Sequence, residues 1–277
     1  MKYTEFLERA HHGFVRRESE GVVYFAAPAL EELGFLTHGF TSRVGGGSLS
    51  PYDTLNLSFT RTPDAEAVRE NFRRAARALD IAFEKLVVCH YCHGSNIETA
   101  RTEHHGMGIT RENTLPFCDG LMVVDADTAA VTLHGDCGAI FFADRQGRAA
   151  GVCHSGWRGT LQNTVAACIR KMQGVGVEGK DMLFAIGPCI SWPHYEVQED
   201  VAGRFRPEYP DAVKERDGKV YLDMESVFAA QLYRVGIPPE NVTFSHLCTY
   251  SDSRMFYSHR RDGQNAGAMG SFICLRQ

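Results

Sequence analysis

The chain has 277 residues, of which 44% are hydrophobic and 23% are charged, and its formal net charge is −5. This length and balance are typical of a soluble globular protein with a sizeable core, and they exclude a disordered or fibrous chain. The negative charge and the lack of a Lys/Arg-rich tract argue against a nucleic-acid partner.

The N-terminus and the cysteines indicate where the protein works. No apolar run approaches the roughly 20 residues that span a bilayer, and MKYTEFLERAHHGF carries charges where a signal peptide would be apolar. We therefore expect no membrane partner and a cytoplasmic location. Nine cysteines are an odd count, and we interpret them as reduced thiols that mostly fill the core.

The N-terminal third predicts strands, a loop and a helix. Residues 21–43 contain two β-rich runs, and the glycine cluster 44-VGGGS-48 that follows must be a loop. Segment 61–81 predicts an amphipathic helix, with Thr62 as N-cap and Pro63 as its first residue. The apolar residues that recur on one face of this helix are Ala65, Val68, Phe72, Ala75 and Leu79.

The middle of the chain, residues 86–159, contains the largest number of strand and turn signals. Segment 86-LVVCHYCHGSNI-97 reads as a strand followed by a loop, and 120–159 contains apolar runs divided by turns, which predicts a β-meander. Cys137 and His154 lie equally far from the turn 144–147, so in a regular hairpin their Cβ atoms would be roughly 4.5–5.5 Å apart. Such a pair suits two ligands of one metal, or a thiolate and its base.

The remainder predicts alternating helices and strands. A helix follows Gly159, a strand occupies 182–190, a helix covers about 222–235, and the end of the chain is β-rich. No linker, repeat or low-complexity tract divides the sequence. We therefore expect one α/β (α+β) domain over residues 1–277, with mixed, largely antiparallel sheets flanked by helices.

Three residues can be assembled into a metal site. The thiolate of Cys137 and the imidazoles of His93 and His154 match the donors that zinc prefers, and three protein ligands leave one position for water or substrate. There is no C-x-x-C or H-E-x-x-H motif, so spacing alone favours a core or hydrogen-bonding role for these residues.

Other polar residues are candidates for binding or proton transfer. Asp136 would point away from Cys137 in a regular strand, so it is an exposed or capping carboxylate unless a bulge brings it to the site. Arg158 lies beside a predicted helix N-terminus, where an anion is favoured, and Arg43 lies beside the glycine cluster. Tyr250 and His259 belong to 246–263, which is either a ligand wall or a solvated loop.

The chain resembles a known family, the zinc-containing purine nucleoside phosphorylases. These proteins have long been called multicopper polyphenol oxidases, or laccase-domain proteins of the YfiH type. The resemblance runs from about Thr37 to the C-terminus. It is carried by HGFTSRVGGGS, YDTLNLS, the histidine of CHYCHGSN, HGDCGAIFFAD, GVCHSGWRGT, IGPCISWPHYEV and CTYSDSRMFYSHRRDG.

The resemblance implies a four-layer sandwich and a zinc ion held by His93, Cys137 and His154. It also implies phosphorolysis of adenosine, inosine, guanosine and methylthioadenosine, adenosine deamination, and, in an older view of the family, copper-dependent phenol oxidation. Where the family usually has Gln-Val this chain has Tyr91-Cys92, and His90 and Cys92 could compete for the metal. His259 replaces a common tyrosine, which puts substrate preference in doubt.

The leading functional prediction is a zinc-dependent purine nucleoside phosphorylase with adenosine deaminase activity, whose partners are purine nucleosides and phosphate. Arg43 and Arg158 would hold phosphate, and Asp136 would move protons near zinc-bound water. One alternative is a cysteine hydrolase or amidase, in which Cys137 attacks and His154 is the base. The other is a polyphenol oxidase that binds Cu²⁺, although the sequence offers no second ligand cluster.

Overall fold

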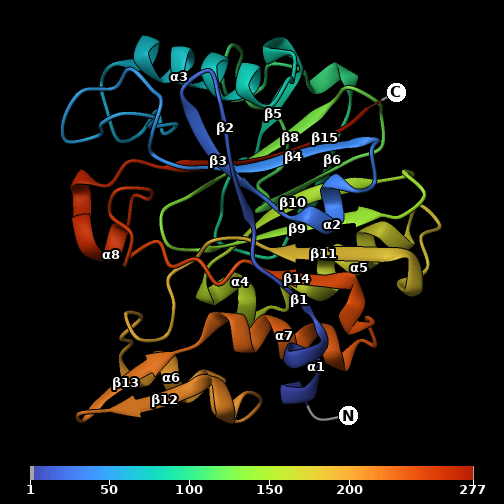
Figure 1. Cartoon of the computed structure of the whole chain (residues 1–277), viewed down its shortest axis with the longest axis vertical. Helices are drawn as coiled ribbons and strands as arrows, with labels where there is room; N and C mark the ends of the chain where they lie inside the picture. The colour runs from blue at the N-terminus through green and yellow to red at the C-terminus, as the bar shows by residue number, and fades with distance from the viewer. Residues whose placement is uncertain (1–2, 277) are drawn as a thin grey trace.

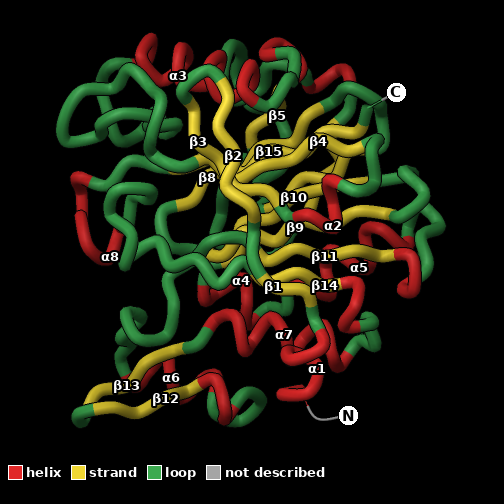
Figure 2. Tube along the Cα trace, viewed as in Figure 1, coloured by secondary structure: helices red, strands yellow, loops and turns green. Residues whose placement is uncertain are grey.

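The computed structural model describes residues 3–276, which form two mixed β-sheets, a two-stranded ribbon and the helices around them (Figures 1 and 2). In spatial order, the first sheet contains β1 (His11–His12), β14 (Val242–Phe244), β11 (Met182–Ile186), β9 (Gly138–Asp144), β10 (Ala150–Ser155), β7 (Gly120–Val123) and β6 (Ile97–Ala100). The second sheet contains β2 (Val15–Ser19), β3 (Val22–Ala26), β4 (Leu36–Thr41), β15 (Met269–Leu275), β8 (Ala129–His134) and β5 (Leu86–Val88). The ribbon pairs β12 (Val213–Arg216) with β13 (Lys219–Leu222).

The helices lie around the two sheets, several of them over the outer faces, whereas the short helix at 28–31 packs into the core between the sheets. They are α1 (Tyr3–Arg9), α2 (Pro28–Glu31), α3 (Ala65–Ala78), α4 (Trp157–Leu161), α5 (Thr164–Gln173), α6 (Glu199–Phe205), α7 (Met224–Arg234) and α8 (His259–Asp262). Short 3₁₀ turns occupy Phe83–Lys85, Thr102–His104, Gly179–Asp181, Pro210–Ala212, Pro239–Asn241 and Gly263–Asn265. Among the described residues, no helix is long and apolar enough to cross a bilayer.

The layers stack in the order helix, sheet, sheet, helix. Figure 1 shows α3 above the sheet that contains β15, and α5 and α7 below the sheet that contains β11. One buried cluster fills the space between the two sheets, a second lies under α3, and a third joins the other sheet to α5 and α7. This arrangement confirms the expected mixed α/β fold with layered sheets and flanking helices.

Strand β9 shows why the sequence requires two covered faces. All of its residues are buried. Ile140 and Phe142 pack on the helix side, whereas Phe141 and Ala143 pack between the sheets, because successive side chains of a strand point to opposite faces. An uninterrupted apolar strand of this kind is stable only where both faces are covered.

The predicted β-meander over 120–159 is wrong. Strands β9 and β10 do form an antiparallel hairpin, and β7 pairs with β10, but β8 leaves for the other sheet and pairs with β15 and β5. Local turn chemistry marks where a strand ends, but it does not determine which sheet the next strand joins. That choice depends on contacts with β15, which is distant in sequence.

The hairpin register also differs from the predicted one. Cys137 was expected opposite His154, but His154 pairs with Ala139. The hairpin is centred one residue further along the chain than expected, because Ala143 pairs with Ala150 and the backbone N–H of Asp144 donates to the carbonyl of Ala149 at 2.8 Å. Inside the turn, the Asp144 carboxylate accepts hydrogen bonds from the backbone and guanidinium of Arg148, at 3.0 and 2.6 Å.

The predicted helices are present with corrected ends. Helix α3 confirms the amphipathic helix, but its N-cap is Asp64, whose side chain accepts from the backbone of Ala67 at 2.9 Å. Thr62 was the expected cap, but its hydroxyl is used by the backbone of Asp64 at 3.2 Å. The helix expected after Gly159 is two helices, because Asn163 adopts a φ of +61° and caps a new start.

Candidate metal centre

His154 lies near the end of β10 and points into the layer between the two sheets. Ala150 and Val152, on the same side of the strand, belong to the core between the sheets, and alternation places His154 with them. Its side chain is buried among residues from both sheets, with only 5% of the residue exposed. His154 is therefore a buried imidazole at the edge of the central layer.

Cys137 lies in the bend that precedes β9, close enough to His154 to raise the pKa of that imidazole. It comes two residues before Ala139, the strand partner of His154. Because the register differs from the expected one by an even number of residues, Cys137 remains on the same side of the sheet as His154. Gly156 is part of this arrangement, since a Cβ atom there would lie 3.0 Å from the Cys137 sulfur.

His93 belongs to the loop between β5 and β6 and adopts a left-handed φ of +56°. Asp119, fully buried before β7, holds this loop in place. Its carboxylate accepts hydrogen bonds from the backbone of His93 at 2.9 Å and of Gly94 at 2.6 Å, and from the Cys92 thiol at 3.0 Å. Strained backbone at functional sites persists where the surroundings enforce it in this way.

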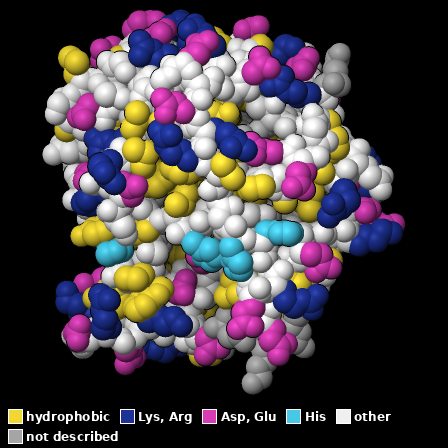
Figure 3. Space-filling view, in the orientation of Figure 1, with side chains coloured by type: hydrophobic (Ala, Val, Ile, Leu, Met, Phe, Trp, Pro, Cys, Tyr) yellow, Lys and Arg dark blue, Asp and Glu magenta, His cyan; other side chains and the backbone are white. Residues whose placement is uncertain are grey.

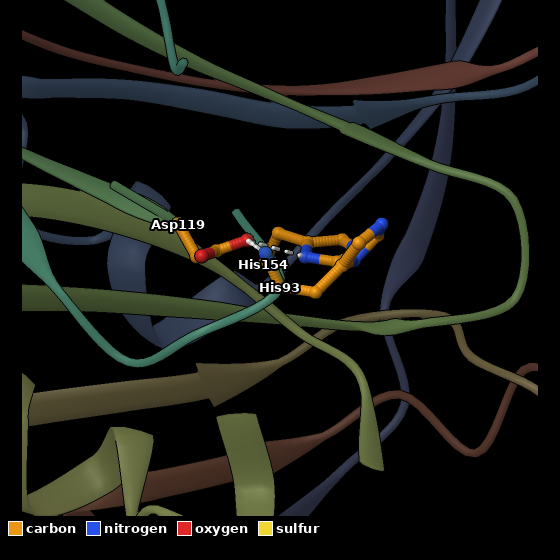
Figure 4. Close-up of side chains that lie close together, drawn as sticks. All are labelled: His93, Asp119 and His154. Atoms are coloured by element: carbon orange, nitrogen blue, oxygen red, sulfur yellow. Dashed lines mark hydrogen bonds and ion pairs between the residues drawn. The ribbon is translucent and has the colours of Figure 1, made fainter. Parts of the chain in front are cut away.

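The same carboxylate reaches the second histidine, so His93, Asp119 and His154 converge (Figure 4). Potential metal-binding atoms of these three residues all lie within 4.8 Å of one another. Sequence analysis missed Asp119. The signal that could have found it is an acidic residue directly before a fully buried strand, 119-DGLMV-123, where a carboxylate persists only if it is paired.

The protonation states in this cluster favour the binding of a cation. Burial alone would raise the pKa of Asp119, but the adjacent imidazole of His154 and hydrogen bonds from Cys92 and Gly94 outweigh burial and hold the pKa at about 2. Burial alone would lower the pKa of His154, but the Cys137 thiolate and the Asp119 carboxylate outweigh it and raise that pKa. Burial and the neighbouring His154 lower the pKa of His93, which keeps its imidazole neutral.

The donor set fits a zinc-type metal ion. Two imidazoles, a carboxylate and a nearby thiol are all ligands that zinc accepts. The Nδ1 atom of His154 is buried without a hydrogen-bond partner and lies 3.4 Å from Oδ1 of Asp119, which matches the carboxylate that commonly orients a metal-bound histidine. Cys137 is not a member of the closest group, so its role as the third ligand stays a prediction.

Two rings, the partly buried Tyr91 and the buried His134, pack against His154 and support the site. The ring of Tyr91 lies 5.4 Å from that of His154, and its hydroxyl accepts from the backbone of Leu133. The ring of His134 lies 5.5 Å from that of His154, and its Nδ1 contacts the carbonyl of Cys137 at 3.2 Å. His134, the last residue of β8, thus connects the bend that contains Cys137 to the sheet that contains β8.

The two expected competitors for the metal have other partners. The thiol of Cys92 donates to Asp119, as described above, and the side chain is exposed. His90 packs against the ring of Phe117 with a centroid separation of 4.0 Å, and its Nδ1 lies 3.4 Å from the carbonyl of Leu115. Neither residue belongs to the group formed by His93, Asp119 and His154.

The two candidate phosphate-binding arginines differ in whether their guanidinium groups already have hydrogen-bond partners in the protein. Arg43 donates from Nε to the carbonyl of Asp53 at 2.9 Å and from Nη1 to that of Ser253 at 3.2 Å, and it stacks on Tyr257. Arg158 is exposed and stacks on Trp157 at 4.2 Å. Within residues 3–276 its guanidinium has no carboxylate partner, and its charge helps to lower the pKa of His93.

The remaining candidates line the loop before β15 and the start of α8. Asp136 accepts from the hydroxyl of Thr249 and from the backbone of Arg260, both at 2.7 Å, so it acts as a capping carboxylate. His259 lies against Gly135. Tyr250 stacks on His194 with a centroid separation of 4.6 Å. Roles for Asp136, Tyr250 and His259 in binding or catalysis stay predictions.

This fold and ligand cluster agree with a comparison to known protein families. Residues 37–276 match the family described as multi-copper polyphenol oxidoreductase laccase. The chain belongs to this family. The match includes His93, Asp119, Cys137 and His154, so the whole candidate metal centre lies in the part shared with the family.

Two bacterial relatives are similar to this chain over most of their own length. The chain is 30% identical over 246 residues to purine nucleoside phosphorylase YlmD of Geobacillus stearothermophilus, which covers 86% of this chain and 90% of the relative. It is 32% identical over 241 residues to a purine nucleoside phosphorylase of Deinococcus radiodurans, with coverages of 86% and 88%. The crystal structure of the Geobacillus protein superposes with a TM-score of 0.87 at 29% identity, over 94% of this chain and 98% of that one.

Proposed function

We propose that the protein is a zinc-dependent purine nucleoside phosphorylase that also deaminates adenosine. The observation that carries the proposal is the convergence of His93, His154 and Asp119 next to Cys137, with the free guanidinium of Arg158 beside them. The names of the relatives support the reaction class. The substrates are purine nucleosides and phosphate.

In this proposal His93, Cys137 and His154 bind the zinc ion, and Asp119 orients His93 and His154. A bound zinc ion supplies Lewis-acid stabilisation of developing negative charge and lowers the pKa of a bound water. Asp119 fixes the loop of His93 through two backbone hydrogen bonds, so the imidazole is held in place before substrate enters. Preorganisation of this kind lowers the cost of reaching the reactive geometry.

Arg158 is the residue that we assign to phosphate. A planar guanidinium binds phosphate oxygens in pairs, and this one is held in position by stacking on Trp157. We assign Arg43 a structural role beside the glycine cluster 44–48 and not a phosphate-binding role, because its Nε and Nη1 already donate to backbone carbonyls. Asp136 is assigned a positioning role for the same reason, since both carboxylate oxygens already accept hydrogen bonds.

A cavity beside these residues suits the nucleoside. It has a volume of about 300 Å³ and is lined by Trp157, Tyr195, Glu196, Val197, Gln198, Val201 and Arg260. Tyr195 lies close enough to Cys137 for the thiolate to raise its pKa, after the larger effect of burial. Aromatic rings with a few polar groups are typical of small-molecule sites, and a purine base can stack on them.

The first prediction concerns the phosphate requirement. In phosphorolysis a phosphate oxygen bonds to C1′, the C1′–N9 bond breaks, and the proton of hydrogen phosphate ends on the purine. Inosine should therefore yield equal amounts of hypoxanthine and ribose 1-phosphate, and only when phosphate is present. Chromatography of reactions with and without phosphate measures both products. Equal hypoxanthine release without phosphate would make the protein a nucleoside hydrolase instead.

A second candidate is a cysteine hydrolase, favoured by the closeness of Cys137 to His154, whose pKa Cys137 helps to raise against the effect of burial. A free catalytic thiolate is nucleophilic, whereas a zinc-bound thiolate is shielded. We expect Cys137 to resist iodoacetamide in the zinc-loaded protein and to react after chelation, as read by peptide mass spectrometry. The exposed Cys92 is the internal control, since it should label in both states. Rapid labelling of Cys137 in the zinc-loaded protein would support the hydrolase.

Copper-dependent phenol oxidation is the least supported alternative. Multicopper centres require several ligand clusters, and within the described part of the chain His93, Asp119 and His154 form the single group of three such residues with mutually close ligand atoms.

A further inference from the structure

A second cluster of metal-binding side chains lies on the surface, away from the residues of the first site. Nδ1 of His12, in β1, lies 2.8 Å from Nε2 of His246, which follows β14. Their ring centroids are 5.0 Å apart and their planes are inclined by 26°, so the two rings meet edge to edge through these nitrogens. Histidine side chains gather on the face shown in Figure 3, across the middle of the molecule.

Glu225, in the first turn of α7, holds the inner histidine of this pair. Its carboxylate lies 2.8 Å from Nδ1 of His246 and 3.2 Å from the backbone nitrogen of the same residue. When His246 is neutral, the proton on Nδ1 is donated to Glu225, so the lone pair is on Nε2 and faces His12. A carboxylate behind a histidine is the arrangement that orients metal ligands in proteins.

We propose that His12 and His246 form a second binding site for a divalent late transition-metal ion such as Zn²⁺, Ni²⁺ or Cu²⁺. Imidazole nitrogen is a good ligand for all three ions. Two nitrogens on one tetrahedral zinc ion lie about 3.3 Å apart, given bond lengths of 2.0–2.1 Å. The two nitrogens therefore need to separate by about half an ångström, and the His12 ring needs to rotate so that both lone pairs point at one ion. His12 is exposed on the short edge strand β1, where this movement meets little resistance.

The proposed ion completes its coordination with water and ties the N-terminal strand to β14 and α7. Strand β1 has only two residues and pairs with β14 alone, so a metal bridge adds a second link at this edge. The site shares no residue with the first one, and the inference is independent of the proposed nucleoside chemistry.

The test is a metal titration of untagged protein that already holds its tightly bound ion. Equilibrium dialysis against Ni²⁺ should detect one further equivalent per chain, and this equivalent should be lost in His12→Gln and His246→Asn. Asparagine is chosen because His246 has a φ of +54°, a conformation that Asn tolerates well. Glu225→Gln should weaken this equivalent about 10- to 100-fold.

The matched control is His11→Gln, because neighbouring residues of a strand point to opposite faces and His11 should leave binding unchanged. With Cu²⁺, the electron paramagnetic resonance spectrum should show two nitrogen ligands, reduced to one in His12→Gln. Retention of the further equivalent in both His12→Gln and His246→Asn would overturn the proposal. Equal loss in His11→Gln would also overturn it, since binding would then be a general property of surface histidines.

Discussion

Cys137→Ser is expected to lose most of the bound zinc, whereas Asp119→Asn is expected to retain one zinc ion with affinity reduced about 10- to 100-fold. The first substitution removes a thiolate that we assign to the metal, and an alcohol is a much poorer zinc ligand. The second leaves the ligands in place but weakens the group that orients them, an effect that commonly has this magnitude. Chelator competition at neutral pH measures both affinities.

Phosphorolysis should follow metal content in both variants. At saturating zinc, Asp119→Asn should recover most of its activity, and Cys137→Ser should not. Cys248→Ser is a matched control, because Cys248 is a partly buried free cysteine whose thiol contacts the backbone of Ser191. The opposite pattern, with zinc retained in Cys137→Ser and lost in Asp119→Asn, would identify the ligands as His93, Asp119 and His154.

Asp119 also shows what the sequence could not reveal. The helix periodicity of α3 and the apolar runs of β9, β11 and β15 are local signals, and the structure contains each of these elements. The partners of Asp119 are 25 residues away at Gly94, 26 residues away at His93 and further still at His154. No spacing rule connects these positions, because their contact depends on how β7 and β10 pair.

The hairpin illustrates a partial success of the same reasoning. Symmetry about the turn located the face shared by Cys137 and His154, and that part of the prediction depends only on the even period of a strand. The register itself was not predictable from the symmetry of 144–147, since the turn is centred one residue later and Ala143 pairs with Ala150. The Asp144 carboxylate binds Arg148 inside this turn, and the pairing moves by two residues, an even number that leaves the same face buried.

Arg158→Ala is expected to slow phosphorolysis about 10- to 100-fold, mainly through a higher KM for phosphate, and to reduce adenosine deamination less. A charge-assisted hydrogen bond contributes roughly 1.5–3 kcal/mol, and each 1.4 kcal/mol is about tenfold in rate. Only phosphorolysis consumes an anion, so only that reaction needs the guanidinium. Zinc content should be unchanged, because Arg158 is not a member of the ligand group.

The matched control is Arg204→Ala. Arg204 also lies over the ring of Trp157, at 5.8 Å from its centroid, but it sits in α6 and its Nε donates to the carbonyl of Asp200. Arg204→Ala removes one positive charge near Trp157, as Arg158→Ala does. The KM for phosphate should nevertheless stay within about twofold, since Arg158 acts on the imidazole of His93 and Arg204 does not. Steady-state kinetics with inosine at varied phosphate separates the two variants. If both raise KM equally, phosphate responds to the general positive field around Trp157, and the specific site assigned to Arg158 is wrong.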